Sequence, residues 1–308
     1  MTEAAALEAR RDAAFLRYGE LAVHRNGAAV ARSFFNPRLP RQAGEVVGLL
    51  GDLALGSAAE TRAVLDAARA WLRDRGCTTV RGPVTRNTWY GFRAMVAGFE
   101  NGPPYPGEPA NGPELPAALT ESGFLPFASY VTWVLETPEA QLDGTRRQVA
   151  RAHAAGYRIR ALDPNQRDAE LRAIHHVVLN AFDEEMNYLF HPIDLEEFAL
   201  VLGPGALAAA TVWLAESAEG EVAGFFYTYP SRYGIVAKTL GVSRTHAGRG
   251  VAALLTAAVH EDAMRQGSIP VVHALMRADG GSLALSAHGT GSGAARLLRR
   301  YAVFGRAA

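Results

Sequence analysis

The sequence predicts an α/β protein, of the α+β type, built from two domains with mixed sheets flanked by helices. Three observations support this fold class. Segments of strand length alternate with helical segments along all 308 residues. A series of strand, loop, helix and strand occurs twice, at residues 45–84 and 236–276. The hydrophobic fraction is 49%, enough for two cores, and no run of apolar residues is long enough to predict a membrane span.

Composition argues against several function classes. The chain carries 31 basic and 31 acidic residues, so no net charge draws it to nucleic acid or to a membrane surface. Lys238 is the only lysine among the basic residues; we attribute this bias to codon usage and infer no function from it. The N-terminal segment MTEAAALEARRDAAF has no apolar signal core, which predicts a cytoplasmic protein.

Cysteine and histidine usage predicts neither a disulfide nor a metal site. Cys77 is the only cysteine, and no Cys/His cluster has the spacing of metal ligands. Because Cys77 lies where a helix is followed by a strand, we expect it to pack in the core rather than to act as a nucleophile.

The first half of the chain predicts a helix, a hairpin, a strand, a helix and a strand. Asn26-Gly27 is a strong turn signal between two alternating segments. Ser57 and Glu60 have the spacing of a capping box, which marks the start of a helix. The expected elements are a helix within residues 1–14, a hairpin at 19–35, a strand at 45–55, a helix at 57–75 and a strand at 77–84.

Residues 86–112 are rich in glycine and proline and predict a loop. Its aromatic side chains, among them Trp89 and Tyr90, are expected to pack within the protein, with an acceptor pocket as the alternative. A helix within 113–124 and a strand at 124–136 complete the first sheet. The arginines between residues 143 and 161 are expected to form a solvated face, and the alternative is a docking face for a carrier protein or an RNA.

The second half predicts a longer series of elements. They are a strand at 157–162, helices at 168–183 and 194–202, strands at 211–215, 221–229 and 236–242, a helix after Gly250, a strand at 269–276, a short helix at 282–286 and a final strand at 298–305.

A glycine loop joins the strand at 236–242 to the following helix. Glycines at 248 and 250 remove β-carbons where backbone must approach a ligand, and the first amides of the helix have no partner within it. The helix dipole favours an anion there, so we expect a phosphate or pyrophosphate. A P-loop would need Lys and Ser or Thr where Val251 and Ala252 stand, and a dinucleotide-binding loop would lie early in a parallel series.

This loop and the order of elements resemble the GNAT superfamily of acyl-CoA-dependent N-acyltransferases. The family's loop reads Gln/Arg-x-x-Gly-x-Gly/Ala; Gly250 and Ala252 match its last two places, and Ala247 departs from the first. A hydrophobic strand that ends in valine precedes the loop, as Leu240-Gly241-Val242 does here. The resemblance covers nearly all of the second half and, in reduced form, the first. It implies sheets that are mostly antiparallel and domains at 1–137 and 156–308, joined by a linker at 138–155.

The resemblance also implies how a coenzyme would bind. Main-chain groups of Leu240, Gly241 and Val242 would hold the pantetheine arm and the oxyanion. The pyrophosphate would lie on the loop residues Ala247, Gly248, Arg249, Gly250, Val251 and Ala252. In the first copy the loop becomes Gly56 to Thr61, and the Glu60 carboxylate would compete with a pyrophosphate. We therefore expect one coenzyme per chain.

Proton transfer is where the sequence departs most from this family. The position of the family's tyrosine acid falls on Ser286, with Tyr301 as a later alternative. A base is expected from the acceptor loop, at Glu184 or Glu185, with His273 as the alternative.

These observations predict an N-acyltransferase that moves an acyl group, most simply acetyl, directly from acyl-CoA to an amine on a small molecule or a peptide. Two alternatives stay open. One is a transferase that uses aminoacyl-tRNA or a carrier protein as donor, and the other is a non-catalytic acyl-CoA-binding protein.

Overall fold

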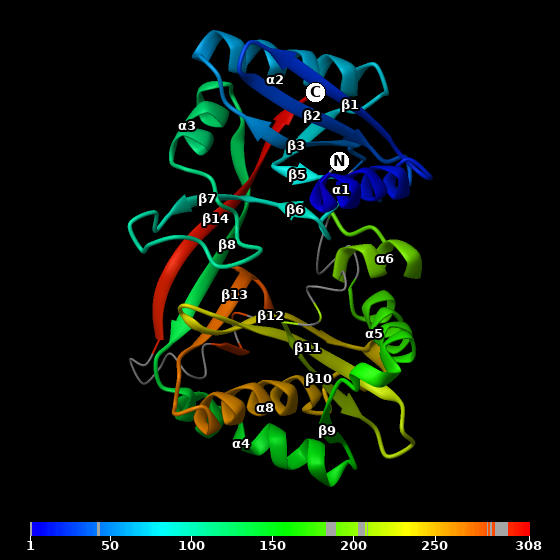
Figure 1. The fold of residues 1–308 in the computed structure, drawn as a ribbon, viewed down its shortest axis with the longest axis vertical. Coiled ribbons are helices and arrows are strands. Elements are labelled where there is room, and N and C mark those ends of the chain that lie inside the picture. The colour runs from blue at the N-terminus through cyan, green and yellow to red at the C-terminus, as the bar shows by residue number, and fades with distance from the viewer. Residues whose placement is uncertain are drawn as a thin grey trace. The chain divides into compact units, whose positions relative to one another are not determined.

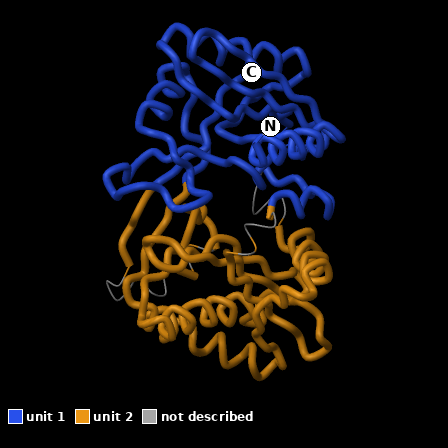
Figure 2. Tube along the Cα trace, in the orientation of Figure 1, with its two compact units in different colours: residues 1–129, 184–201, 300–308 blue, residues 130–183, 202–299 orange. Residues whose placement is uncertain are grey.

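The computed structural model describes residues 2–41, 44–182, 189–202, 207, 209–281, 283, 285–286 and 295–308. These residues form two compact units, each assembled from separate stretches of chain (Figure 2). Unit 1 contains residues 1–129, 184–201 and 300–308, and unit 2 contains residues 130–183 and 202–299. The domain boundaries near residues 137 and 155 stay a prediction.

Unit 1 is built on a hairpin and a parallel strand pair. Its first elements are α1 (Glu3–Phe15), β1 (Glu20–Asn26), β2 (Ala29–Phe35), β3 (Val47–Ala54), α2 (Ala58–Arg73) and β4 (Thr79–Gly82). The hairpin turns at Asn26 and Gly27, as predicted, and β3 pairs in parallel with β4. Helix α2 buries Leu65, Ala68 and Leu72 in the unit's core, where Cys77 also lies. Burial raises the pKa of the Cys77 thiol to about 11, so packing explains this residue.

The segment predicted as a loop at 86–112 is partly ordered into short strands. Unit 1 continues with β5 (Val84–Thr85), β6 (Gly91–Phe92), β7 (Ala94–Ala97), α3 (Glu114–Glu121) and the start of β8 (Leu125–Leu135). Strands β5 and β6 form a small sheet of their own, and β7 pairs with the last strand of the chain. The glycines and prolines of residues 86–112 therefore limit the length of the strands in this segment but do not prevent strands from forming.

Unit 2 contains a mostly antiparallel sheet with helices against it (Figure 1). Its elements are α4 (Pro138–Ala154), β9 (Arg158–Ala161), α5 (Arg167–Ala181), β10 (Thr211–Glu216), β11 (Val222–Ser231), β12 (Gly234–Val242), α8 (Val251–Arg265) and β13 (Val271–Arg277). The strand order is β13-β12-β11-β10-β9, and among these described strands only β12 and β13 pair in parallel. Helix α4 packs on α8, which packs on the sheet, while α5 lies against β11 and β12. The predicted fold class is confirmed.

The chain exchanges two strands between its halves, which the sequence did not predict. Residues 130–135 of β8 pair with β13 in unit 2, although we expected this strand to complete the first sheet. Residues 300–307 of β14 (Ala295–Ala307) pair with β7 and β4 in unit 1, although we expected the last strand, at 298–305, within the domain at 156–308. Strand periodicity does not encode the pairing partner, so sequence order alone did not predict these neighbours.

Across the described ranges, no helix is both long and apolar enough to cross a membrane.

Candidate functional site

Strands β12 and β13 pair briefly and then separate. Their parallel register runs from Ile235 opposite Val271 to Ala237 opposite His273, and it ends there. A β-bulge in β12 follows at once, because Thr239 pairs with Tyr227 of β11 while Ala237 pairs with Thr228. Lys238 is the extra residue of this bulge. A bulge bends its strand and increases the local twist, and this one lies where the pairing of β12 with β13 ends.

A second irregularity lies in β13, just after the last residue that pairs with β12. Its register against β8 shifts between His273 and Met276, and Leu275 has a φ of 57°. The Leu275 amide donates to Thr132 Oγ1 at 3.1 Å, which holds the bulged backbone against β8. Beyond these irregularities Leu240 to Val242 and the end of β13 are not paired with each other, and we call this unpaired stretch the gap between β12 and β13.

The open end of β12 leads to the amino end of α8. After a short 3₁₀ turn, Gly248 and Gly250 take positive φ values of 71° and 89°, and Gly250 is the N-cap. No side chain caps this helix, and Leu254 donates to the Gly250 carbonyl at 2.9 Å. Loop residues Ala247, Gly248 and Arg249 are exposed. The first-turn amides of α8 therefore have no side-chain cap among the described residues, and anion binding there stays a prediction.

The reason for a glycine at position 250 differs from the one we inferred. A β-carbon there would lie 2.3 Å from the Gln148 carbonyl oxygen of α4, so the missing side chain lets two helices approach closely. At Gly248, a β-carbon would meet nothing within 4 Å. The positive φ therefore explains the glycine at position 248, while both the positive φ and the close helix packing explain the glycine at position 250.

The corresponding loop in unit 1 is closed by the protein's own side chains. Ser57 Oγ accepts from the Glu60 amide at 3.3 Å, and Glu60 Oε2 accepts from the Ser57 amide at 2.8 Å, which completes the predicted capping box. Thr61 Oγ1 accepts from the Gly56 amide at 3.2 Å. The amides of Gly56, Ser57 and Glu60 at the start of α2 are therefore occupied by the protein's own side chains.

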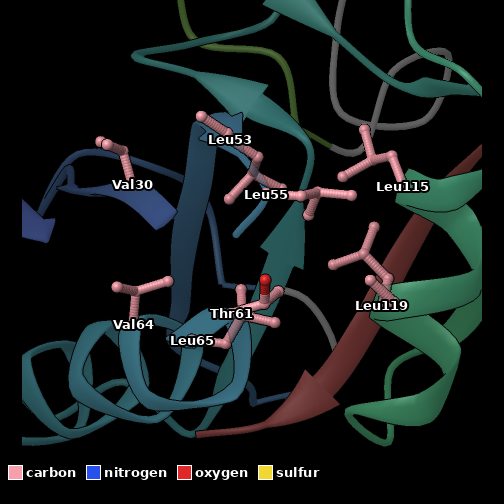
Figure 3. A pocket seen from close by; sticks show the side chains of 10 residues that line it. Val30, Leu53, Leu55, Thr61, Val64, Leu65, Leu115 and Leu119 are labelled. Atoms are coloured by element: carbon pink, nitrogen blue, oxygen red, sulfur yellow. The ribbon is translucent and has the colours of Figure 1, made fainter. Parts of the chain in front are cut away.

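Side chains also fill the space beside this first loop. Apolar residues from the end of β3, from α2 and from α3 surround a cavity of about 10 Å³; they include Leu53, Leu55, Val64, Leu65, Leu115 and Leu119 (Figure 3). Such a cavity holds about one water molecule and no pantetheine arm.

The candidates His273 and Ser286 lie together, in a buried polar chain with His260 of α8. His273 Nε2 is 2.9 Å from His260 Nε2, and His273 Nδ1 is 2.5 Å from Ser286 Oγ. Ser286 also donates to Met276 Sδ at 3.0 Å. Burial lowers the pKa of His273 to about 4, and burial followed by the neighbouring His273 lowers that of His260. Both imidazoles are therefore neutral at pH 7, and His273 faces α8.

Acidification is expected to destabilise unit 2 through His273. The unfolded chain protonates this imidazole near pH 6.5, while the folded chain does so only near pH 4, so the unfolded state binds more protons between these values. Stability is complete above pH 6.5 and falls by about 3 kcal/mol as the pH drops to 4. Urea unfolding at pH 7.5 and 5 should show a smaller pH effect for His273→Asn than for the wild type. The exposed control His153→Asn should keep the wild-type difference; equal differences in all three would contradict this origin.

The remaining sequence candidates are placed as follows. Glu184 and Glu185 lie outside the described residues, so their role as base stays a prediction. Tyr301 lies in unit 1, is buried, and donates its hydroxyl to Glu108. Among the arginines expected to form a solvated face, Arg160 instead binds Glu170 and Glu216, each at 2.6 Å. Trp89 packs edge-on against Phe198, with ring centroids 5.7 Å apart.

A buried carboxylate cluster in unit 1 was missed by the sequence analysis. Glu197 of α6 (Leu195–Leu202) is fully buried, and its Oε1 accepts from the hydroxyls of Tyr18 and Tyr90, each at 3.0 Å, and from Asn87 Nδ2 at 3.2 Å. Burial raises the pKa of Glu197. The donors come from two segments, one at Tyr18 and one at Asn87 and Tyr90, and both lie far from Glu197 in the sequence, so no local pattern could have revealed the cluster.

Removing this carboxylate is expected to destabilise unit 1. Glu197→Ala removes the acceptor of two half-buried tyrosine hydroxyls and one of the two acceptors of the Asn87 amide, and it should lower the free energy of unfolding by about 2–4 kcal/mol. Glu197→Gln keeps an oxygen at this place and should cost about half as much or less. Urea denaturation, with Glu196→Ala as an exposed neighbouring control, measures this. A Glu197→Ala variant as stable as the control would show that these hydrogen bonds contribute nothing.

Comparisons with known proteins show the fold. No family model and no curated protein matches the sequence. Among solved structures, a GCN5-related N-acetyltransferase from Sphaerobacter thermophilus matches at a TM-score of 0.51 and 16% identity, over 91% of this chain and 76% of that one. A probable N-acyltransferase from Enterococcus faecalis matches at 0.56 and 10% identity, over 97% and 64%. A fungal GCN5-related glucosamine N-acetyltransferase region, within a multi-domain β-N-acetylglucosaminidase, matches at 0.54 and 11%, over 96% and 34%. These identities are low, so the similarity establishes the GNAT fold alone.

Proposed function

We propose that this chain, which has the GNAT fold, is an acyl-CoA-dependent N-acyltransferase whose acyl donor binds to unit 2. One observation carries the proposal: the gap between β12 and β13 leads directly to an uncapped helix start at α8. A gap in a sheet accommodates an extended arm, and an uncapped helix start accommodates the pyrophosphate at the end of that arm.

The loop residues Ala247 to Ala252 would hold the pyrophosphate through their amides, with the exposed Arg249 beside it. The backbone of Leu240, Gly241 and Val242 would hold the arm and offer a donor to the developing oxyanion. Gly241 also suits this place for another reason, because a β-carbon there would lie 2.6 Å from the ring of Phe225. We propose acetyl-CoA as the donor, since no described feature calls for a longer acyl chain.

Transfer to an amine requires a base for the ammonium and a proton for the departing thiolate. We propose Glu184 or Glu185 for the first task and Ser286 for the second. The Ser286 hydroxyl lies close to His273 and donates to the thioether sulfur of Met276. A thioether is a weak hydrogen-bond acceptor, so the hydroxyl could donate to a stronger acceptor, such as the departing thiolate, instead. His273 would then position Ser286, while its role as base is the alternative. Its low pKa argues for the positioning role.

The first half of the chain, residues 1–137, would be a second GNAT-like domain that has lost coenzyme binding, joined through residues 138–155 to the active domain at 156–308. The capping box at α2 and the filled space beside it support this part of the proposal. The acceptor would be an amine on a small molecule or a peptide.

A thermal-shift screen with coenzyme A, acetyl-CoA, longer acyl-CoAs and tRNA tests the proposal. Acetyl-CoA should raise the stability by about 2.7 kcal/mol at a hundredfold excess over its dissociation constant. Stabilisation by tRNA alone would favour the aminoacyl-tRNA alternative instead. Coenzyme binding without turnover of any amine, in a screen of amino acids, polyamines, amino sugars and peptides, would favour a binding protein.

A further inference from the structure

We propose that Lys238 is a self-acylation site, at which its Nζ takes the acyl group from the thioester bound to unit 2. This inference rests on the proposed function, because it needs an acyl-CoA in the gap between β12 and β13. It starts from a coincidence of sequence and structure. Of the 31 basic residues in the chain, one is a lysine, Lys238. It is the bulged residue of β12, at the point where the gap begins.

The packing of β12 shows which face Lys238 is on. Ile235 and Ala237 belong to the apolar cluster that contains residues of α8, and Leu240 and Val242 pack against the same cluster. Along this face, Ile235 and Ala237 are two residues apart, Ala237 and Leu240 are three apart, and Leu240 and Val242 are two apart. The step of three residues spans the bulge. By the alternation of side chains in a strand, Lys238 lies on the opposite face from Ala237. It is half-buried there, on the face against which α5 packs.

The length of the gap places a thioester near Lys238. Residues 238 and 242 are separated by four strand steps, about 13 Å, and the loop before α8 adds to this distance. The sum is of the order of the extended arm that separates the pyrophosphate of coenzyme A from its sulfur. A pyrophosphate on the α8 amides therefore brings the sulfur and its acyl group to the closed end of the gap. Lys238 carries a flexible four-carbon stem at that end.

The reaction needs only the bound acyl-CoA. Neutral Nζ attacks the thioester carbonyl, a C–N bond forms, and the C–S bond breaks. The coenzyme leaves as a thiolate, which takes the proton lost by the lysine nitrogen, so the products are an amide and free coenzyme A. Holding the two groups together makes the step effectively unimolecular and raises its rate well above that in solution. An arginine could not do this, because a guanidinium stays protonated.

The single lysine makes the test direct. Full-length protein is incubated with acetyl-CoA and no acceptor, and the intact mass is followed with time. We expect a gain of one acetyl group, and peptide mapping should place it on Lys238 rather than on the N-terminal amine. Lys238→Arg should gain none, while binding acetyl-CoA in calorimetry within a few-fold of the wild type.

A loop variant separates site-directed acylation from chemistry in solution. Ala252→Glu puts a carboxylate in the first turn of α8 and should slow acylation of Lys238 by at least about tenfold. Equal rates in this variant and the wild type would contradict the inference. Calorimetric binding of acetyl-CoA with no acetyl group on Lys238 would contradict it while leaving the proposed function intact. Absence of binding would overturn the proposed function, and the inference with it.

Discussion

The Ala252→Glu variant is expected to lose affinity for acetyl-CoA by about 10²-fold or more while its stability stays near that of the wild type. Ala252 is the second residue of α8, where the helix dipole favours a carboxylate by about 0.3–1 kcal/mol, so folding should not suffer. The same carboxylate competes with the pyrophosphate for the first-turn amides and repels it. Two like charges about 4 Å apart near a protein surface repel by about 4 kcal/mol, and a tenfold change in affinity requires about 1.4 kcal/mol.

Unit 1 provides the matched control. Ala59 is the second residue of α2 and is exposed, so Ala59→Glu makes the same chemical change at the other copy of the loop. Isothermal titration with acetyl-CoA should give the wild-type affinity for Ala59→Glu. If instead Ala59→Glu weakens binding and Ala252→Glu does not, the coenzyme belongs to unit 1 and our assignment is reversed.

A fragment of residues 150–308 is expected to aggregate when it is expressed alone. It lacks β8, so β13 loses the antiparallel partner that runs from Tyr130 to Leu135. It also lacks β4 and β7, the partners of the second half of β14, and most of α4, which covers α8. Unpaired strand edges and an uncovered apolar helix face are the features that lead to aggregation.

Co-expression with residues 1–149 should rescue the fragment, because that piece supplies β8 to β13 and supplies β4 and β7 to β14. Size-exclusion chromatography should then show the two pieces eluting together. A fragment 150–308 that is soluble, monomeric and binds acetyl-CoA with wild-type affinity would show that the exchanged strands are dispensable. We expect any partly folded fragment to lose amine turnover before it loses coenzyme binding.

Local signals predicted most of the secondary structure. The Asn26-Gly27 turn, the capping box of Ser57 and Glu60, and the glycines before α8 each act within a few residues, so sequence proximity carries the information. The pairing partners of β8 and β14, in contrast, depend on residues that are far away in the sequence. The segments that form β8 and β14 have ordinary strand patterns, and their partners are chosen by packing across distant parts of the chain. The sequence therefore predicted both strands but not their neighbours in the sheet.

The candidate site follows the same division. The anion loop before α8 was predictable because its chemistry lies in the backbone of one short segment. Neither bulge had a sequence signal, since Lys238 and Leu275 stand in otherwise regular strand patterns. In the sequence, His260 is an ordinary polar residue of a helix. Its role in the site follows only from the fold, which brings His273 of β13 within 2.9 Å of it. The candidate bases Glu184 and Glu185 stay predictions.

A calorimetric titration of the full chain with acetyl-CoA tests the central claim most directly. The claim is that the opening beside α8 binds an acyl-CoA and that the closed, capped copy beside α2 does not. We predict one site per chain. Two sites would show that the capping box and the filled space in unit 1 do not exclude the coenzyme, and no binding would show that the chain has kept the fold without the donor.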